Sequence, residues 1–163
     1  MEEAILRSSL ALAGLFLAYH SFAKPINVSI DCGNISIELV EKGSINSRIT
    51  HAGDNKPVIT LQDDQLTIKH LPQCNNGASI TVSLPKSDSI EIQMGAGNLN
   101  IKGAAMLANT HKLRTSVAAG NIDSQVPAIK TSRSTASMNA ENNVTSSKVF
   151  KVQLGAGNMS FIP

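Results

Sequence analysis

The chain has 163 residues, with 14 Lys and Arg against 12 Asp and Glu, and a formal net charge of +2 at pH 7. This mild balance argues against the strongly basic surface that nucleic acids or anionic membranes select. With no Trp and only 3% aromatic residues, the sequence also disfavours sugar or single-stranded nucleic-acid sites that depend on aromatic stacking.

Residues 1–23 have the pattern of a secretory signal peptide. An apolar run, Ser8–Tyr19, is followed by the small-residue sequence Ser-Phe-Ala, the order expected of a hydrophobic region and its cleavage site. The run is shorter than the roughly 20 apolar residues of a membrane-spanning helix. Glu2 and Glu3 weaken the usual basic start, which leaves a buried amphipathic helix as the alternative. We expect an exported protein with no transmembrane segment, in the periplasm or on the cell surface.

After the signal peptide, the pattern predicts one all-β domain over 24–163, a length that suits a single core. Its first half, 24–89, reads as short strands joined in hairpins, and its second half, 90–163, carries a repeated motif. Val58–Gln62 and Gln65–Lys69 alternate apolar and polar residues on either side of two Asp residues. We predict a hairpin there.

The repeated motif of the second half is an apolar residue, a small-residue step ending in Asn, and another apolar residue. It occurs twice as Gly-Ala-Gly-Asn, once as Ala-Ala-Gly-Asn, and once in a degraded form around Asn142; Gly33-Asn34 resembles an early, weaker copy. The predicted corner residues are Gly97, Asn98, Gly120, Asn121, Asn142, Gly157 and Asn158. The four Asn residues are 23, 21 and 16 positions apart, and a period near twenty is typical of stacked repeats.

Each copy predicts a strand that turns a corner. The apolar positions change parity between Met94 and Leu99, so the chain must bend or bulge there if both are buried. Gly tolerates positive φ and Asn visits the left-handed region readily, which suits both to the corner. We expect a β-solenoid of the single-stranded β-helix kind, each coil stacked on the one before, with corner Asn side chains in a hydrogen-bonded ladder. A phosphate-binding loop is the alternative, but that motif needs a helix after it, and strand-like runs follow here.

These Gly-x-Gly-Asn copies resemble the repeats of the bacterial "head GIN" family of auto-transporter adhesin-like domains and related envelope β-solenoid domains. The resemblance covers residues 90–163 well and 26–89 loosely. It implies a β-solenoid at the cell envelope or surface, with no catalytic residues. The adhesin role that it implies rests on analogy.

The two cysteines, Cys32 and Cys74, lie far apart in the sequence. Because an exported protein meets an oxidising compartment, we predict a disulfide between them. The alternative, a catalytic or metal-binding thiol pair, lacks C-x-x-C spacing and a nearby His.

Other chemistry is sparse in the sequence. His51, His70 and His111 are scattered without the spacing of a metal site, and we expect surface positions for them. Ala104–Lys112 predicts a helical turn in an insertion that loops out of the repeats, and Ser116–Ser147 predicts a poorly packed coil or a mobile edge. No nucleophile motif is present, so we expect no enzymatic activity, no metal and no cofactor.

Three functions are compatible with these patterns. The first is an exported, non-enzymatic adhesin-like interaction module of the envelope or surface. The second is a periplasmic structural or regulatory domain that binds another envelope protein. The third, a small glycan-acting β-helix, needs carboxylate clusters and aromatic subsites that the sequence does not show.

We expect a protein partner, which is either a second copy of the chain or an envelope protein. Because the chain ends directly after the last repeat, we expect an incompletely covered C-terminal coil that a partner or a second copy covers.

Overall fold

The computed structural model describes residues 24–51, 56–69 and 78–163. Three predictions lie outside these residues: the signal peptide at 1–23, Cys74 and His70. The described part is mostly β-structure, as predicted. Its elements in chain order are β1 (Ile26–Val40), β2 (Asn46–His51), β3 (Val58–Gln62), β4 (Gln65–Lys69), β5 (Ser79–Pro85), β6 (Ser89–Lys102), α1 (Ala105–Ala108), β7 (Lys112–Ser124), β8 (Lys130–Arg133), β9 (Met138–Glu141) and β10 (Val149–Ile162).

The strands form one mixed ten-stranded sheet with the order β2-β5-β1-β6-β10-β7-β9-β8, and β3 joins it through β4, which pairs with β1. Four long strands, β1, β6, β10 and β7, make the centre and run parallel in register. Antiparallel pairs close both ends: β2 on β5 and β3 on β4 at one end, and β9 with β8 on β7 at the other. The predicted hairpin of β3 and β4 is confirmed.

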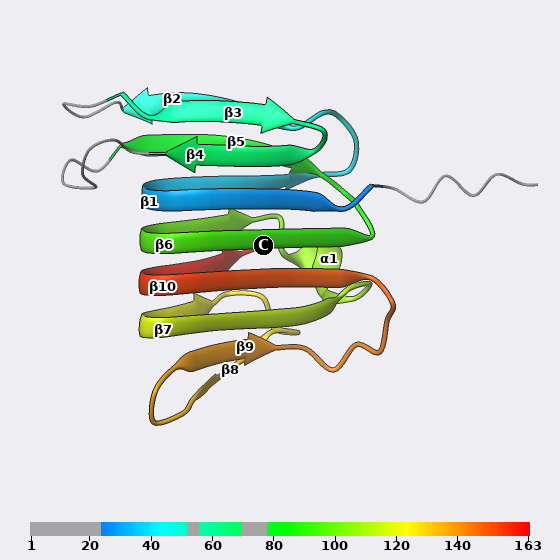
Figure 1. The fold of residues 1–163 in the computed structure, drawn as a ribbon. Coiled ribbons are helices and arrows are strands. Elements are labelled where there is room, and N and C mark those ends of the chain that lie inside the picture. Colours follow the sequence, from blue (N-terminus) through cyan, green and yellow to red (C-terminus); the bar gives the residue numbers. More distant parts are fainter. Residues whose placement is uncertain (1–23, 52–55, 70–77) are drawn as a thin grey trace, which may run out of the picture.

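Each long strand folds back on itself at its Gly-Asn step, so its first and second halves lie in two layers (Figure 1). In β6 both Met94 and Leu99 are buried, and the parity change between them is the bend that the sequence predicts. Gly97 at the bend has φ of +125°, a region in which a Cβ atom is strained. The apolar side chains of both layers form one cluster, so the core lies between the two layers.

The Gly-Asn steps of the four strands stand in register. The glycines Gly33, Gly97, Gly157 and Gly120 form one column, and all four have positive φ. The asparagines beside them form the predicted ladder, which we call the Asn ladder: Asn34, Asn98, Asn158 and Asn121. In this order, each Asn after the first donates its Nδ2 to the Oδ1 of the one before it: Asn98 to Asn34 at 2.8 Å, Asn158 to Asn98 at 3.2 Å, and Asn121 to Asn158 at 3.4 Å. The ladder ends on Arg133, which donates to Asn121 at 3.0 Å.

Asn142, predicted as a fourth corner, is not part of this column. It follows β9, which runs antiparallel to β7, and its side chain bonds the backbone at the C-terminal end of α1 and just after it. Its Nδ2 donates to the carbonyls of Ala108 and His111 at 2.7 Å and 2.8 Å, and its Oδ1 accepts from the Leu113 N–H at 3.0 Å. The physical reason is the preceding residue, Glu141, which does not have the conformational freedom that Gly gives the true corners.

The stacking order differs from the predicted one. β10 lies between β6 and β7 and pairs with both, so successive repeats are not simply stacked in chain order. The C-terminal strand is therefore central, and Phe161 near its end is fully buried. The prediction of an uncovered C-terminal coil is therefore wrong.

Two further segments differ from expectation. The predicted insertion, Ala104–Lys112, holds the one-turn helix α1, but it does not loop out: Ala104, Leu107 and Ala108 are buried against the core. The segment Ser116–Ser147, predicted as a poorly packed coil or a mobile edge, begins in the central strand β7, where Val117 and Ile122 are buried. The rest contributes β8 and β9, of which β8 is exposed at all four positions. Within the described residues, no helix has the length and apolar character to cross a membrane.

Candidate interaction surface

The sheet presents two outer faces, one on each layer. The first halves of β1, β6, β10 and β7 turn alternate side chains outward. In register across these four strands they form a column of Asn27, Glu91, Lys151 and Arg114, and a second column of Ser29, Gln93, Gln153 and Ser116. We call this surface the Gln face. The second halves carry the Asn ladder, and we call that surface the ladder face.

The Gln face is hollowed. Gly95 and Gly155 lie next to its second column and leave space there because they have no side chain. A Cβ atom on Gly95 would meet the backbone carbonyl of Asp31, and one on Gly155 would meet that of Gly95, so larger residues do not fit. The result is an open depression of about 550 Å³ that is lined by Ser29, Gln93, Ser116, Ala118 and Gln153, among others. A second hollow of about 300 Å³ continues it over Arg114, Asn139, Glu141 and Lys151.

Charge on the Gln face is balanced. Lys151 donates to Glu91 at 2.7 Å, and Gln93 donates to the same carboxylate at 2.9 Å. These two contacts, the Lys151 ammonium first, hold the pKa of Glu91 below its usual range. Arg114 stands opposite Glu141 in the β7–β9 register. A face with paired charges selects partners by hydrogen bonding and shape more than by net charge.

The two faces differ in what they leave open to a partner. On the ladder face the asparagines bond to one another along the ladder, and Ser160 donates to Asn100 at 2.6 Å. The hydroxyl of Ser36, which stands in register with Asn100, is buried and has no hydrogen-bond partner among the described residues. On the Gln face, the side chains of Ser29, Ser116 and Gln153 form no hydrogen bond with another described residue. Their hydroxyl and amide groups are therefore available to a ligand.

Aromatic stacking plays no part in the described surface. After residue 23 the aromatic residues are Phe150 and Phe161, and both are buried in the core. The Gln face can therefore offer hydroxyl and amide groups to a partner, but no ring on which a sugar or base could stack.

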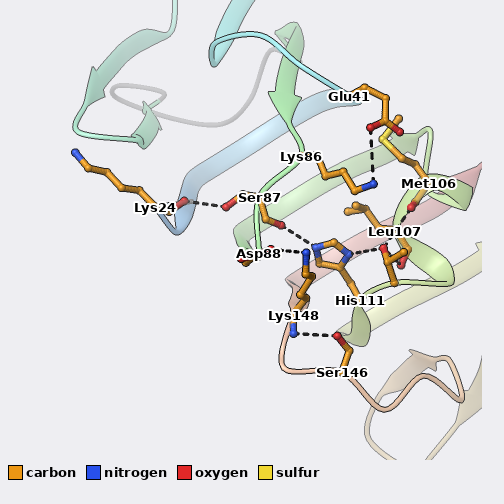
Figure 2. Close-up of polar contacts among 11 residues, drawn as sticks. Lys24, Glu41, Lys86, Ser87, Asp88, Met106, Leu107, His111, Ser146 and Lys148 are labelled. Atoms are coloured by element: carbon orange, nitrogen blue, oxygen red, sulfur yellow. Dashed lines mark hydrogen bonds and ion pairs between the residues drawn. The ribbon is translucent and has the colours of Figure 1, made fainter. Parts of the chain in front are cut away.

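A second candidate is the buried polar cluster around His111 (Figure 2). His111 is 1% exposed, so its predicted surface position is wrong. Its Nε2 lies 2.7 Å from the Ser87 carbonyl, and its Nδ1 lies 2.8 Å from the Thr110 hydroxyl. Because a carbonyl only accepts, Nε2 carries a proton and donates it to the Ser87 carbonyl.

This cluster joins the segments that precede β1, β6, β7 and β10. Ser87 donates its hydroxyl to the Lys24 carbonyl at 2.8 Å, and Lys148 forms an ion pair with Asp88 at 2.7 Å. Since the ring of His111 is buried and bonded at both nitrogens, it fastens the strand starts and does not present itself to a substrate. Within the described residues no group of three or more His, Cys, Asp or Glu side chains could hold a metal ion.

The other predicted residues fall in separate places. His51 is exposed at the end of β2. Cys32 is buried beside the corner of β1, and its pairing with Cys74 stays a prediction because Cys74 lies outside the described residues. The sequence analysis did not predict the Gln face. Its signal in the sequence is a polar residue four positions before each corner glycine: Ser29, Gln93, Ser116 and Gln153. These residues are seen to form one column only when the register of the strands is known.

Comparisons with known proteins show a distant structural likeness. No protein-family model matches the sequence, and no curated protein matches it. Among solved structures, the fold is similar to a crystal structure of a protein from Clostridium sporogenes described as a "putative cell adhesion protein". The TM-score is 0.40 at 9% identity, over 86% of this chain and 93% of that one.

Proposed function

We propose that this protein is an exported, non-enzymatic interaction module of the cell envelope, adhesin-like in action, and that it binds its partner through the Gln face. We also propose that the four long strands act as a short β-solenoid-like stack that displays this face. The observation that carries the proposal is the hollowed column of Ser29, Gln93, Gln153 and Ser116, whose hydroxyl and amide groups are aligned by the register of four parallel strands.

The chemistry of this face favours a partner rich in hydrogen-bonding groups, such as an extended polar peptide or a hydroxylated polymer. Three of the four side chains in the column have no protein partner among the described residues, so binding does not have to break a bond within the face. Export is supported by the signal-peptide pattern of residues 1–23.

The first experiment locates the protein. A tagged chain is exposed to protease on intact cells and, as control, on osmotically shocked cells. Digestion on intact cells supports a surface adhesin-like module. Protection until the envelope is breached supports instead a periplasmic domain that binds another envelope protein, and uncleaved chain in the cytoplasm refutes export.

The second experiment tests the face. A double variant, Gln93→Arg with Gln153→Arg, places two long cations across the hollow, and attachment of expressing cells to a coated surface is measured. The matched control, Asn100→Arg with Ser160→Arg, adds the same charge to the same two strands on the ladder face. We expect the first variant to reduce attachment by at least about tenfold, as loss of a central contact does, with the control close to wild type. Equal effects of the two variants would reject the Gln face.

A further inference from the structure

The two ends of the sheet differ in how their edge strands are protected. β8 ends the sheet on one side with the sequence Lys-Thr-Ser-Arg, exposed throughout. β3, at the other end (Figure 1), has no charged residue and carries Val58 and Leu61, which are 53% and 51% exposed. These are the exposed large apolar side chains of the described residues. Natural edge strands are usually blunted with charges such as Lys, as β8 is and β3 is not.

Among the residues that the structure describes, none closes the core where it reaches this edge. Ile59 and Leu61 of β3 stand opposite Ile68 and Leu66 of β4, and the two β4 residues are fully buried. Ile59 and Leu61 therefore lie on the core side of the sheet, yet Leu61 is half exposed. One more strand beside β3 would cover it.

The backbone of β3 is arranged to accept such a strand. β3 and β4 join through a two-residue turn, Asp63-Asp64, with φ of +48° and +66°, so Gln62 and Gln65 form the hydrogen-bonded pair that closes the hairpin. Alternation then directs the backbone groups of Thr60 and Val58 toward β4. The N–H and C=O groups of Ile59 and Leu61 point to the open edge.

We propose that β3 pairs antiparallel with β3 of a second copy of this chain, on a two-fold axis at Thr60. In this register Ile59 of one copy exchanges hydrogen bonds with Leu61 of the other, and both side chains extend the core across the interface. Thr60 faces Thr60 at the axis as a non-hydrogen-bonded pair.

Charge complementarity selects a second copy as the occupant. The same register brings Lys56, which precedes β3, beside the Asp63-Asp64 turn of the other copy, once at each end of the pair. Pro57 lacks an N–H group and limits the ladder to the neutral centre of the strand. The β2 edge at the same end of the sheet carries Arg48 and His51, so the uncharged, self-complementary edge is that of β3.

A cysteine at the axis tests this register directly. Antiparallel partners in a non-hydrogen-bonded pair have Cα atoms about 4.5 Å apart, within the range of a disulfide. The full chain with Thr60→Cys is oxidised and run on a non-reducing gel. We expect a disulfide-linked dimer. The matched control, Val58→Cys, has its two cysteines about 13 Å apart in this register, at about 3.3 Å per residue, and is expected to stay monomeric.

A charge exchange supplies the second measurement. Lys56→Asp sets Asp against Asp64 of the other copy, and we expect dimerisation in sedimentation equilibrium to weaken at least tenfold. Adding Asp64→Lys restores the opposite-charge pairing and should restore the dimer. The proposal is overturned if Thr60→Cys cross-links no better than Val58→Cys, or if the wild-type chain sediments as a monomer at all concentrations. The outcome is independent of whatever binds the Gln face.

Discussion

Two regions of the chain carry similar sequences and adopt different structures. The Gly-Asn steps of β1, β6, β7 and β10 fold each strand at the same level and join it to its neighbours. The segment around Asn142 repeats the Asn and its apolar neighbours, yet β9 runs antiparallel, stops at Glu141, and leaves Asn142 to bond the backbone around α1.

The difference shows that the glycine, more than the asparagine, determines the corner. A Cβ on Gly97, Gly120 or Gly157 would overlap the carbonyl oxygen of the glycine in the neighbouring strand. Each of these residues also has a positive φ. Glu141 meets neither requirement, whereas Gly33, in the early, weaker copy, has the positive φ of the corner and stands in register with Gly97.

The largest effect is expected from a methyl group in this glycine column. Gly157→Ala adds backbone strain at φ +133° and an overlap with Gly97 that only separation of β10 from β6 can relieve. We expect a loss of more than about 4 kcal/mol, or failure to fold. Gly43→Ala is the matched control, because it has φ +141° but its nearest neighbour, Val40, is 3.9 Å away.

Chemical unfolding of the two variants separates strain from crowding. The Gly43→Ala variant should lose only about 1–2 kcal/mol, the cost of placing Cβ at positive φ. If Gly157→Ala is no less stable than Gly43→Ala, the close approach of the strands is not what requires glycine at the corner. The positive φ alone would then explain that requirement.

The second effect concerns the Asn that the repeat pattern misassigned. Asn142→Ala removes three hydrogen bonds from backbone groups near α1, two of them to carbonyls. We expect a loss of about 2–3 kcal/mol in thermal or urea unfolding, because partly buried backbone groups lose their partner. Asn143→Ala, one residue on, is the control and should stay within about 0.5 kcal/mol of wild type. Equal stability of the two variants would mean that water replaces the Asn142 side chain without cost.

Sequence patterns predicted the local structure well and the assembly of the strands less well. The β3–β4 hairpin, the parity change at the corners and the Asn ladder follow from alternation and Gly-Asn chemistry, which are local. The position of β10 between β6 and β7 does not follow from these local patterns. All three strands carry the same motif, so each is equally compatible with either neighbour. The Gln face was missed because its columns depend on the register of strands about 60 residues apart. His111 was missed because its burial depends on Ser87, 24 residues away in the sequence.

The smallest effect is expected within the Asn ladder, where exposed amides bond one another. Asn158 donates to Asn98 and accepts from Asn121, whereas Asn34 at the end of the ladder accepts from Asn98 alone. Asn158→Ala should therefore cost about 1–2 kcal/mol and Asn34→Ala about half as much, since a solvent-exposed amide bond contributes on the order of 0.5–1 kcal/mol.

The comparison is made by urea unfolding of both single variants and of the double variant. Because the two residues share Asn98 as a partner, the double variant should lose less than the sum of the single losses if the ladder acts as a connected network. Strict additivity would mean that each amide bonds independently, and the ladder would then be a consequence of the glycine column that adds little of its own to the stack.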